Sequence, residues 1–112
     1  MHLTTTLPLL SLIPLALAVS RDCTRPSYSG SSTWTCRWYG GEAGEGQNCG
    51  YSSYELEFEE QVDGQLYVDN NRGESVSDMA RQGAITQDCA DAAPVDRCAG
   101  DSYIRLWCDV GR

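Results

Sequence analysis

Two segments of the chain alternate between apolar and polar residues with the period of a β-strand. They are residues 33–39 (TWTCRWY) and residues 102–110 (SYIRLWCDV), and both are rich in β-branched and aromatic residues. In each segment one face collects cysteine and apolar side chains, while the other face carries an arginine, Arg37 or Arg105, among further aromatic residues. This period of two predicts two strands with one face on a core.

Residues 54–70 (YELEFEEQVDGQLYVDN) predict a β-hairpin. A two-residue turn at Asp63-Gly64 would place Leu66 opposite Gln61 and mix apolar with charged positions. A three-residue turn over 62–64 keeps glycine at a left-handed position and gathers the apolar residues on one side, so we predict that bulged turn. The predicted pairs are Phe58 with Val68, Leu66 with Glu60, and Gln61 with Gln65, with Leu56, Phe58, Leu66 and Val68 facing inward.

One segment, residues 73–89 (GESVSDMARQGAITQDC), has helical periodicity. Ser75 can cap its first turn, with Asp78 three residues later as in a capping box. Gly83 suits a left-handed end after about two turns. The order strand, hairpin, helix, strand predicts an α+β fold, a mostly antiparallel four-stranded sheet with one short helix. The helical stripe comprises Val76, Met79, Ala80 and Gly83.

The remaining segments have the composition of loops. Residues 21–32 form a polar N-terminal arm, residues 40–50 contain five glycines, and residues 88–100 form a polar segment bounded by cysteines. We expect all three to lack regular structure.

The first twenty residues differ from the rest of the chain. An uncharged apolar run from Leu7 to Val19 is followed by small residues, and cleavage after Ala18 or after Ser20 fits that pattern. The run is shorter than the roughly 20 apolar residues of a membrane span. We therefore predict a signal peptide over residues 1–20 and a single secreted, extracellular domain over residues 21–112, which we expect to be a monomer.

Six cysteines fall after the predicted signal peptide. An even number of cysteines in a small secreted chain is typical of a disulfide framework. No C-x-x-C spacing is present and the one histidine is His2, so we expect disulfides, no metal site and no cofactor. The sequence does not choose among the pairings of Cys23, Cys36, Cys49, Cys89, Cys98 and Cys108.

Charge and missing residue types narrow the function. The formal net charge is −8 at pH 7, the chain has no lysine, and its single histidine lies in the predicted signal peptide. Histidine-activated nucleophiles and lysine Schiff bases are therefore excluded from the predicted mature chain. Nucleic acids and anionic membranes require basic patches, so we expect neither as a partner.

The dense carboxylates of the hairpin leave one enzymatic alternative. Glu55, Glu57 and Glu59 alternate with apolar residues, and a pair of them would suit a small secreted carbohydrate hydrolase. Such an enzyme needs a cleft and a carboxyl group in an apolar pocket. A chain this small has little room for either, so we favour a solvated strand face and expect no enzyme.

The outward face of the predicted sheet carries the candidate binding residues. Aromatic and arginine side chains on a face that no helix covers are typical of a binding patch. Alternatively, the N-terminal arm and the 40–50 loop fold over them and make a second small core. In the predicted register Glu57 lies opposite Asp69, and the two arginines can pair with the glutamates if their strands neighbour the hairpin. The candidates are Arg37, Tyr39, Tyr67, Tyr103, Arg105 and Trp107.

The signal sequence, the six cysteines and the aromatic-x-Cys motif Trp34-Thr35-Cys36 resemble small secreted cysteine-rich proteins of filamentous fungi, many of them candidate effectors. The element order from Leu66 to Cys108 also looks like fungal killer-toxin-like folds. The resemblance implies a role between organisms and assigns no catalytic or binding residue. We expect a non-enzymatic protein that recognises a protein or glycan outside the producing cell, with an antimicrobial toxin as a further alternative.

Overall fold

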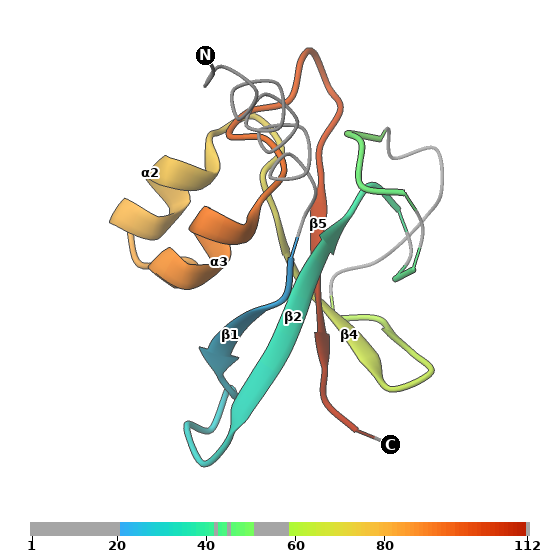
Figure 1. Ribbon diagram of the computed structural model, residues 1–112, viewed down its shortest axis with the longest axis vertical. Helices are drawn as coiled ribbons and strands as arrows, with labels where there is room; N and C mark the ends of the chain where they lie inside the picture. The colour runs from blue at the N-terminus through green and yellow to red at the C-terminus, as the bar shows by residue number, and fades with distance from the viewer. Residues whose placement is uncertain (1–20, 42, 45, 51–58, 112) are drawn as a thin grey trace, which may run out of the picture.

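The computed structural model describes residues 21–41, 43–44, 46–50 and 59–111. Within these ranges, five strands form one antiparallel sheet in the order β1-β2-β5-β4-β3, and helices α2 and α3 pack against one face of it (Figure 1). The predicted signal peptide lies outside the described residues. The elements are β1 Cys23–Pro26, β2 Thr33–Tyr39, β3 Gln61–Val62, β4 Gln65–Asn70, α2 Val76–Arg81, α3 Gln87–Ala92 and β5 Arg105–Asp109.

The predicted α+β class is confirmed, and the sheet has one strand more than expected. The additional strand is β1, which lies in the segment predicted to be an irregular arm. It pairs antiparallel with β2, so that Cys23 lies opposite Cys36 and Thr24 opposite Thr35. A tight connection over 27–32 joins the two strands, with the Ser27 amide donating to the Ser32 carbonyl at 2.9 Å.

The elements with strong local signals form where the sequence predicts them. Strand β2 has the predicted bounds. Helix α2 begins after Ser75, whose hydroxyl accepts a hydrogen bond from the Asp78 amide at 3.0 Å. Val76 and Met79 of the predicted stripe are buried. The chain leaves the helix at Gly83 with φ of 82°, the left-handed conformation expected there.

Helix α3 replaces the start of a predicted loop. The Thr86 hydroxyl accepts a hydrogen bond from the Cys89 amide at 3.2 Å and caps the helix. Cys89 and Ala92 are its buried side chains, one turn apart. The polar composition of this segment concealed a helix because only two of its six residues need to face the core.

The hairpin turn differs from the predicted one. Gln61 pairs with Leu66 and Val62 with Gln65, which leaves a two-residue turn at Asp63 and Gly64. Both turn residues are left-handed, with φ of 52° and 83°, and Asp-Gly tolerates this pair of conformations well. The predicted pairs of Leu66 with Glu60 and of Gln61 with Gln65 are therefore wrong, and the pair of Phe58 with Val68 lies outside the described residues.

A bulge follows the hairpin turn on the β3 side. The Glu59 amide donates to the Tyr67 carbonyl at 2.8 Å, and the Tyr67 amide donates to the Glu60 carbonyl at 3.0 Å. Two residues thus face one, and Glu59 takes the left-handed conformation with φ of 66°. The extra residue that we predicted inside the turn lies in this bulge instead.

The core lies between the helices and the face of the sheet that they cover, which we call the inner face. Trp38, Ile104 and Leu106 are fully buried there, and the Trp38 indole donates to the Cys89 carbonyl at 2.8 Å. In the part of the chain described, no helix is long and apolar enough to cross a membrane.

All six cysteines are paired, which confirms the predicted disulfide framework. Cys23–Cys89 ties β1 to α3, Cys36–Cys108 joins β2 to β5, and Cys49–Cys98 ties the 40–50 loop to the segment before β5. The bridges close long separations in sequence, which is where cross-links constrain the unfolded chain most.

Candidate functional site

The register of the strands arranges the side chains of the opposite, outer face in three rows. Residues directly opposite each other on antiparallel neighbours point to the same side of the sheet. The rows, read across β2, β5 and β4, are Thr35, Asp109 and Gln65; then Arg37, Trp107 and Tyr67; then Tyr39, Arg105 and Asn70.

The 40–50 loop covers the aromatic part of this face. The Trp107 indole donates to the Gly41 carbonyl at 2.8 Å, and the Arg105 guanidinium donates to the Gly40 carbonyl. Tyr67 stacks on Trp107 with ring centroids 5.4 Å apart. This small cluster is a second core, as in the covered alternative.

Four of the six predicted binding residues therefore lie inside the protein. Tyr67, Tyr103, Arg105 and Trp107 are between 0% and 6% exposed, so no partner contacts them in this conformation. The N-terminal arm forms β1 at the edge of the sheet, and its Asp22 pairs with Arg37 on the outer face. Arg37 and Tyr39 remain partly exposed.

Glycine allows the covering loop to close. A Cβ atom on Gly40 would lie 2.0 Å from the Asn48 carbonyl oxygen, and one on Gly50 would lie 2.3 Å from the Gly40 carbonyl oxygen. Gly50 also exchanges two backbone hydrogen bonds with Tyr103, at 2.9 and 2.8 Å. The glycines in this segment thus bring the loop backbone within reach of the arginine and the indole.

Beside the cover, the outer face opens into a polar pocket of about 310 Å³, which we call the outer-face pocket. Its volume is at the small end of the range for ligand sites. Arg37 and Tyr39 are the predicted binding residues that it contains. The described residues that line it are Asp22, Thr35, Cys36, Arg37, Tyr39, Gln65 and Asp109.

The charges of the outer-face pocket do not cancel. Arg37 Nε lies 2.8 Å from Asp22 Oδ1, and this ion pair is well exposed. Asp109 is also exposed, and its carboxylate accepts a hydrogen bond from the Gly111 amide at 3.1 Å. No arginine of the described segments forms an ion pair with Asp109. The pocket therefore carries a net negative charge.

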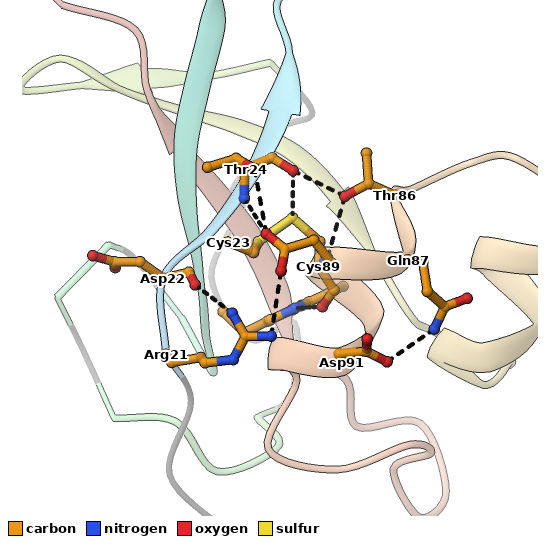
Figure 2. A network of polar contacts seen from close by, with 10 residues as sticks. Arg21, Asp22, Cys23, Thr24, Thr86, Gln87, Cys89 and Asp91 are labelled. Atoms are coloured by element: carbon orange, nitrogen blue, oxygen red, sulfur yellow. Dashed lines mark hydrogen bonds and ion pairs between the residues drawn. A yellow bond between two sulfur atoms is a disulfide. The ribbon is translucent and has the colours of Figure 1, made fainter.

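Asp22 is held in place by the attachment of β1 to α3. The Thr86 hydroxyl donates to the Thr24 carbonyl at 3.0 Å, and this contact lies beside the Cys23–Cys89 bridge (Figure 2). The Asp88 carboxylate accepts from the Thr24 amide at 2.8 Å, and that hydrogen bond, with a smaller contribution from Arg21, lowers the pKa of Asp88. These contacts fix the strand that leads directly from Asp22.

The structure tests the predicted pairing of arginines with the hairpin carboxylates only for Arg37 and for the position of Asp69. Arg37 pairs with Asp22 instead. A register shift between Tyr67 and Asp69 places Asp69 opposite Leu106, outside the three outer rows, where burial raises its pKa. Glu57 lies outside the described residues.

Of the three glutamates of the catalytic alternative, the structure describes only Glu59. Glu55 and Glu57 lie outside the described residues, and Glu59 is an exposed residue of the bulge. Within the described ranges, no group of three or more histidine, cysteine or acidic residues could hold a metal ion.

Five lining residues were not among the predicted binding residues: Asp22, Thr35, Cys36, Gln65 and Asp109, of which Cys36 was predicted only as a disulfide cysteine. Alternation in the sequence already places Thr35 beside Arg37 and Asp109 beside Trp107 on the outward faces, so these two could have been found. Asp22, which directly precedes β1, and Gln65 of β4 reach the pocket through strand pairings that only the structure reveals.

Comparison with protein-family models, with curated proteins and with solved structures finds no significant match to this chain.

Proposed function

We propose that this is a secreted, non-enzymatic interaction protein that recognises an extracellular partner through the outer-face pocket. The observation that carries the proposal is the way in which this pocket is built. Three strands supply Thr35, Asp109 and Gln65 in one cross-strand row, and the Cys36–Cys108 bridge joins two of these strands next to that row. A rigid, preformed site loses little entropy on binding.

The disulfides support the proposed location. Three bridges in so small a chain suit an oxidising, extracellular environment. Together with the resemblance to small cysteine-rich proteins of filamentous fungi, they support our proposal that the protein is a fungal effector that contributes to virulence. The partner acts outside the producing cell in this proposal.

The chemistry of the lining residues supports recognition more than catalysis. They supply carboxylates, an amide, hydroxyl groups and an arginine that is already paired with Asp22. None of the described lining residues is a histidine, a lysine or a free cysteine, the usual bases and nucleophiles. Such groups bind and orient a polar ligand.

A blocking substitution tests the proposal. Thr35→Arg puts a long side chain into the pocket from an exposed strand position, so the fold should persist. Thr33→Arg makes the same change on the same face of β2, at an exposed position outside the lining. We expect at least tenfold less labelled Thr35→Arg protein than wild-type protein to bind to host extracellular material. Thr33→Arg protein should bind as much as the wild type. Equal retention of the two folded variants would overturn the proposal.

Two further assays address the alternatives. Release of sugar from wall polysaccharides by the wild-type protein, abolished by Glu59→Gln, would favour a carbohydrate hydrolase. Inhibition of microbial growth by folded protein, unaffected by Thr35→Arg, would favour a toxin that acts without the pocket.

A further inference from the structure

We infer that the outer-face pocket binds the guanidinium group of an arginine side chain on a basic partner protein. This inference rests on the proposed function and specifies the chemical class of the partner. It follows from the pocket's charge, its hydrogen-bond acceptors and its aromatic wall.

The charge selects a cation. Arg37 is 2.8 Å from Asp22, so the positive charge of the pocket is already balanced by a carboxylate. Asp109 adds a second carboxylate that no described arginine neutralises, and one of its oxygens accepts only a backbone amide hydrogen bond. An anionic ligand such as a phosphate would be repelled, whereas a cation gains a charge-assisted hydrogen bond.

The arrangement of acceptors suits a planar donor. Thr35, Asp109 and Gln65, whose side chains carry a hydroxyl, a carboxylate and an amide oxygen, occupy one cross-strand row on β2, β5 and β4. A guanidinium presents five N–H donors in one plane and accepts nothing, so a row of oxygens matches it better than it matches the compact ammonium group of lysine.

Tyr39 supplies an aromatic wall. It is partly exposed and lines the pocket from the same strand as Thr35 and Arg37. A guanidinium stacks favourably on an aromatic ring while its edge donates to a carboxylate. A saccharide could also use the ring, but it carries no positive charge to complement the Asp109 carboxylate, and the charged donor here, Arg37, is engaged by Asp22.

The charge of the whole molecule points to the same partner. A net charge of −8 attracts a basic protein surface and repels an acidic one over about a Debye length. Complementary charge raises the rate of encounter and makes it sensitive to salt. A pocket of about 310 Å³ has room for one side chain at the centre of such a contact.

The probe is an acetylated and amidated Gly-Arg-Gly-Arg-Gly peptide, titrated into isotope-labelled protein and followed by NMR. Its control replaces both arginines with citrulline, which keeps the shape and removes the charge. We expect the arginine peptide to shift the amide resonances of Thr35, Gln65 and Asp109, the citrulline peptide to shift them little, and the affinity to fall as salt is added.

Protein variants localise the charge. Asp109→Asn keeps the size of the side chain and the acceptor for the Gly111 amide, and we expect it to weaken peptide binding at least about tenfold. Asp101→Asn removes the same charge at an exposed position outside the lining and should leave binding unchanged. Equal weakening by the two variants would show a non-specific charge effect and overturn the inference.

A soluble β-glucan or chitin oligosaccharide serves as the competing probe. If the saccharide shifts the same resonances and the arginine peptide does not, the guanidinium inference is wrong while the pocket remains a recognition site. If neither probe binds at millimolar concentration, the inference is likewise overturned. The proposed function itself fails only if Thr35→Arg protein keeps its retention on extracellular material.

Discussion

At the scale of single residues, the most unusual feature is a buried arginine in an acidic protein. Arg105 is 1% exposed, donates to the Gly40 carbonyl and lies 4.3 Å from the centre of the Tyr103 ring. A buried cation must keep its partners, because the cost of removing it from water is recovered only through them. Arg105 therefore holds the covering loop against the sheet.

Replacing Arg105 with Met should destabilise the protein by about 1–3 kcal/mol, because the Gly40 carbonyl loses its buried donor. Chemical denaturation measures the change. Arg81→Met is the control, since the Arg81 side chain is 72% exposed and pairs with the Asp78 carboxylate at the surface of α2. A loss for Arg105→Met no larger than that for Arg81→Met would contradict the role given to this side chain.

Asp69 makes stability depend on pH in the opposite direction to Asp88. Burial raises the pKa of Asp69, so its ionisation disfavours the folded state. The contribution of the protonated Asp69 to the free energy of unfolding is therefore fully present below the unfolded pKa of about 3.9. It is lost as the pH rises through the folded pKa. Asp69→Asn keeps an acceptor for the Asn70 amide and removes the charge, so we expect it to stabilise the protein at pH 7.

The stabilisation by Asp69→Asn should disappear below pH 4, where residue 69 is neutral in the wild type as well as in the variant. Denaturation curves between pH 3 and pH 7 test this, with Asp101→Asn correcting for the change in net charge. A gain that is the same at pH 3 and pH 7 would be inconsistent with ionisation as its cause.

At the scale of elements, α3 and β1 depend on each other. Neither was predicted, and each stabilises the other through the Cys23–Cys89 bridge and the contacts of Thr86 with both. A strand of four residues and a helix of six are each too short to persist alone. Their stability is tertiary, and local sequence patterns therefore indicate them poorly.

Thr86→Ala should cost about 2 kcal/mol, because the hydroxyl both caps α3 and donates to the Thr24 carbonyl, and each hydrogen bond is worth about 1 kcal/mol. Thr86→Ser keeps the hydroxyl and should stay within about 0.5 kcal/mol of the wild type. Thermal or chemical denaturation of both variants provides the measurement. Similar losses for Ala and Ser would show that the methyl group, not the hydroxyl, matters.

The elements that were predicted correctly have signals contained in their own residues. β2 alternates over its full length, and α2 has a capping serine and a terminal glycine. The predicted hairpin turn was wrong because a bulge at Glu59 moves the extra residue out of the turn, and only the backbone pairing of Glu59 and Glu60 with Tyr67 reveals it. Register is a property of two strands, so one strand's sequence does not determine it.

At the scale of the whole molecule, the candidate site could be predicted only in part. Alternation placed Arg37 and Tyr39 on the outer face correctly, but it could not show that glycine-containing segments fold over the neighbouring aromatic residues. The order of strands decides which half of the face is covered. The Cys36–Cys108 bridge joins the two neighbouring strands β2 and β5, but cysteine spacing in the sequence does not predict which cysteines pair.

The positions of Cys23, Cys36 and Cys108 on neighbouring strands affect how the chain folds to this structure. Cys36 lies directly opposite Cys23 on one side and Cys108 on the other, so two thiols compete for one partner during oxidative folding. Opposed residues on neighbouring strands are close to disulfide distance. If the β1-β2 hairpin oxidises first, Cys23 forms a disulfide with Cys36, and Cys89 and Cys108 are left without their native partners. Productive folding therefore requires β5 to join β2, or α3 to reach Cys23, before the hairpin closes its own bridge.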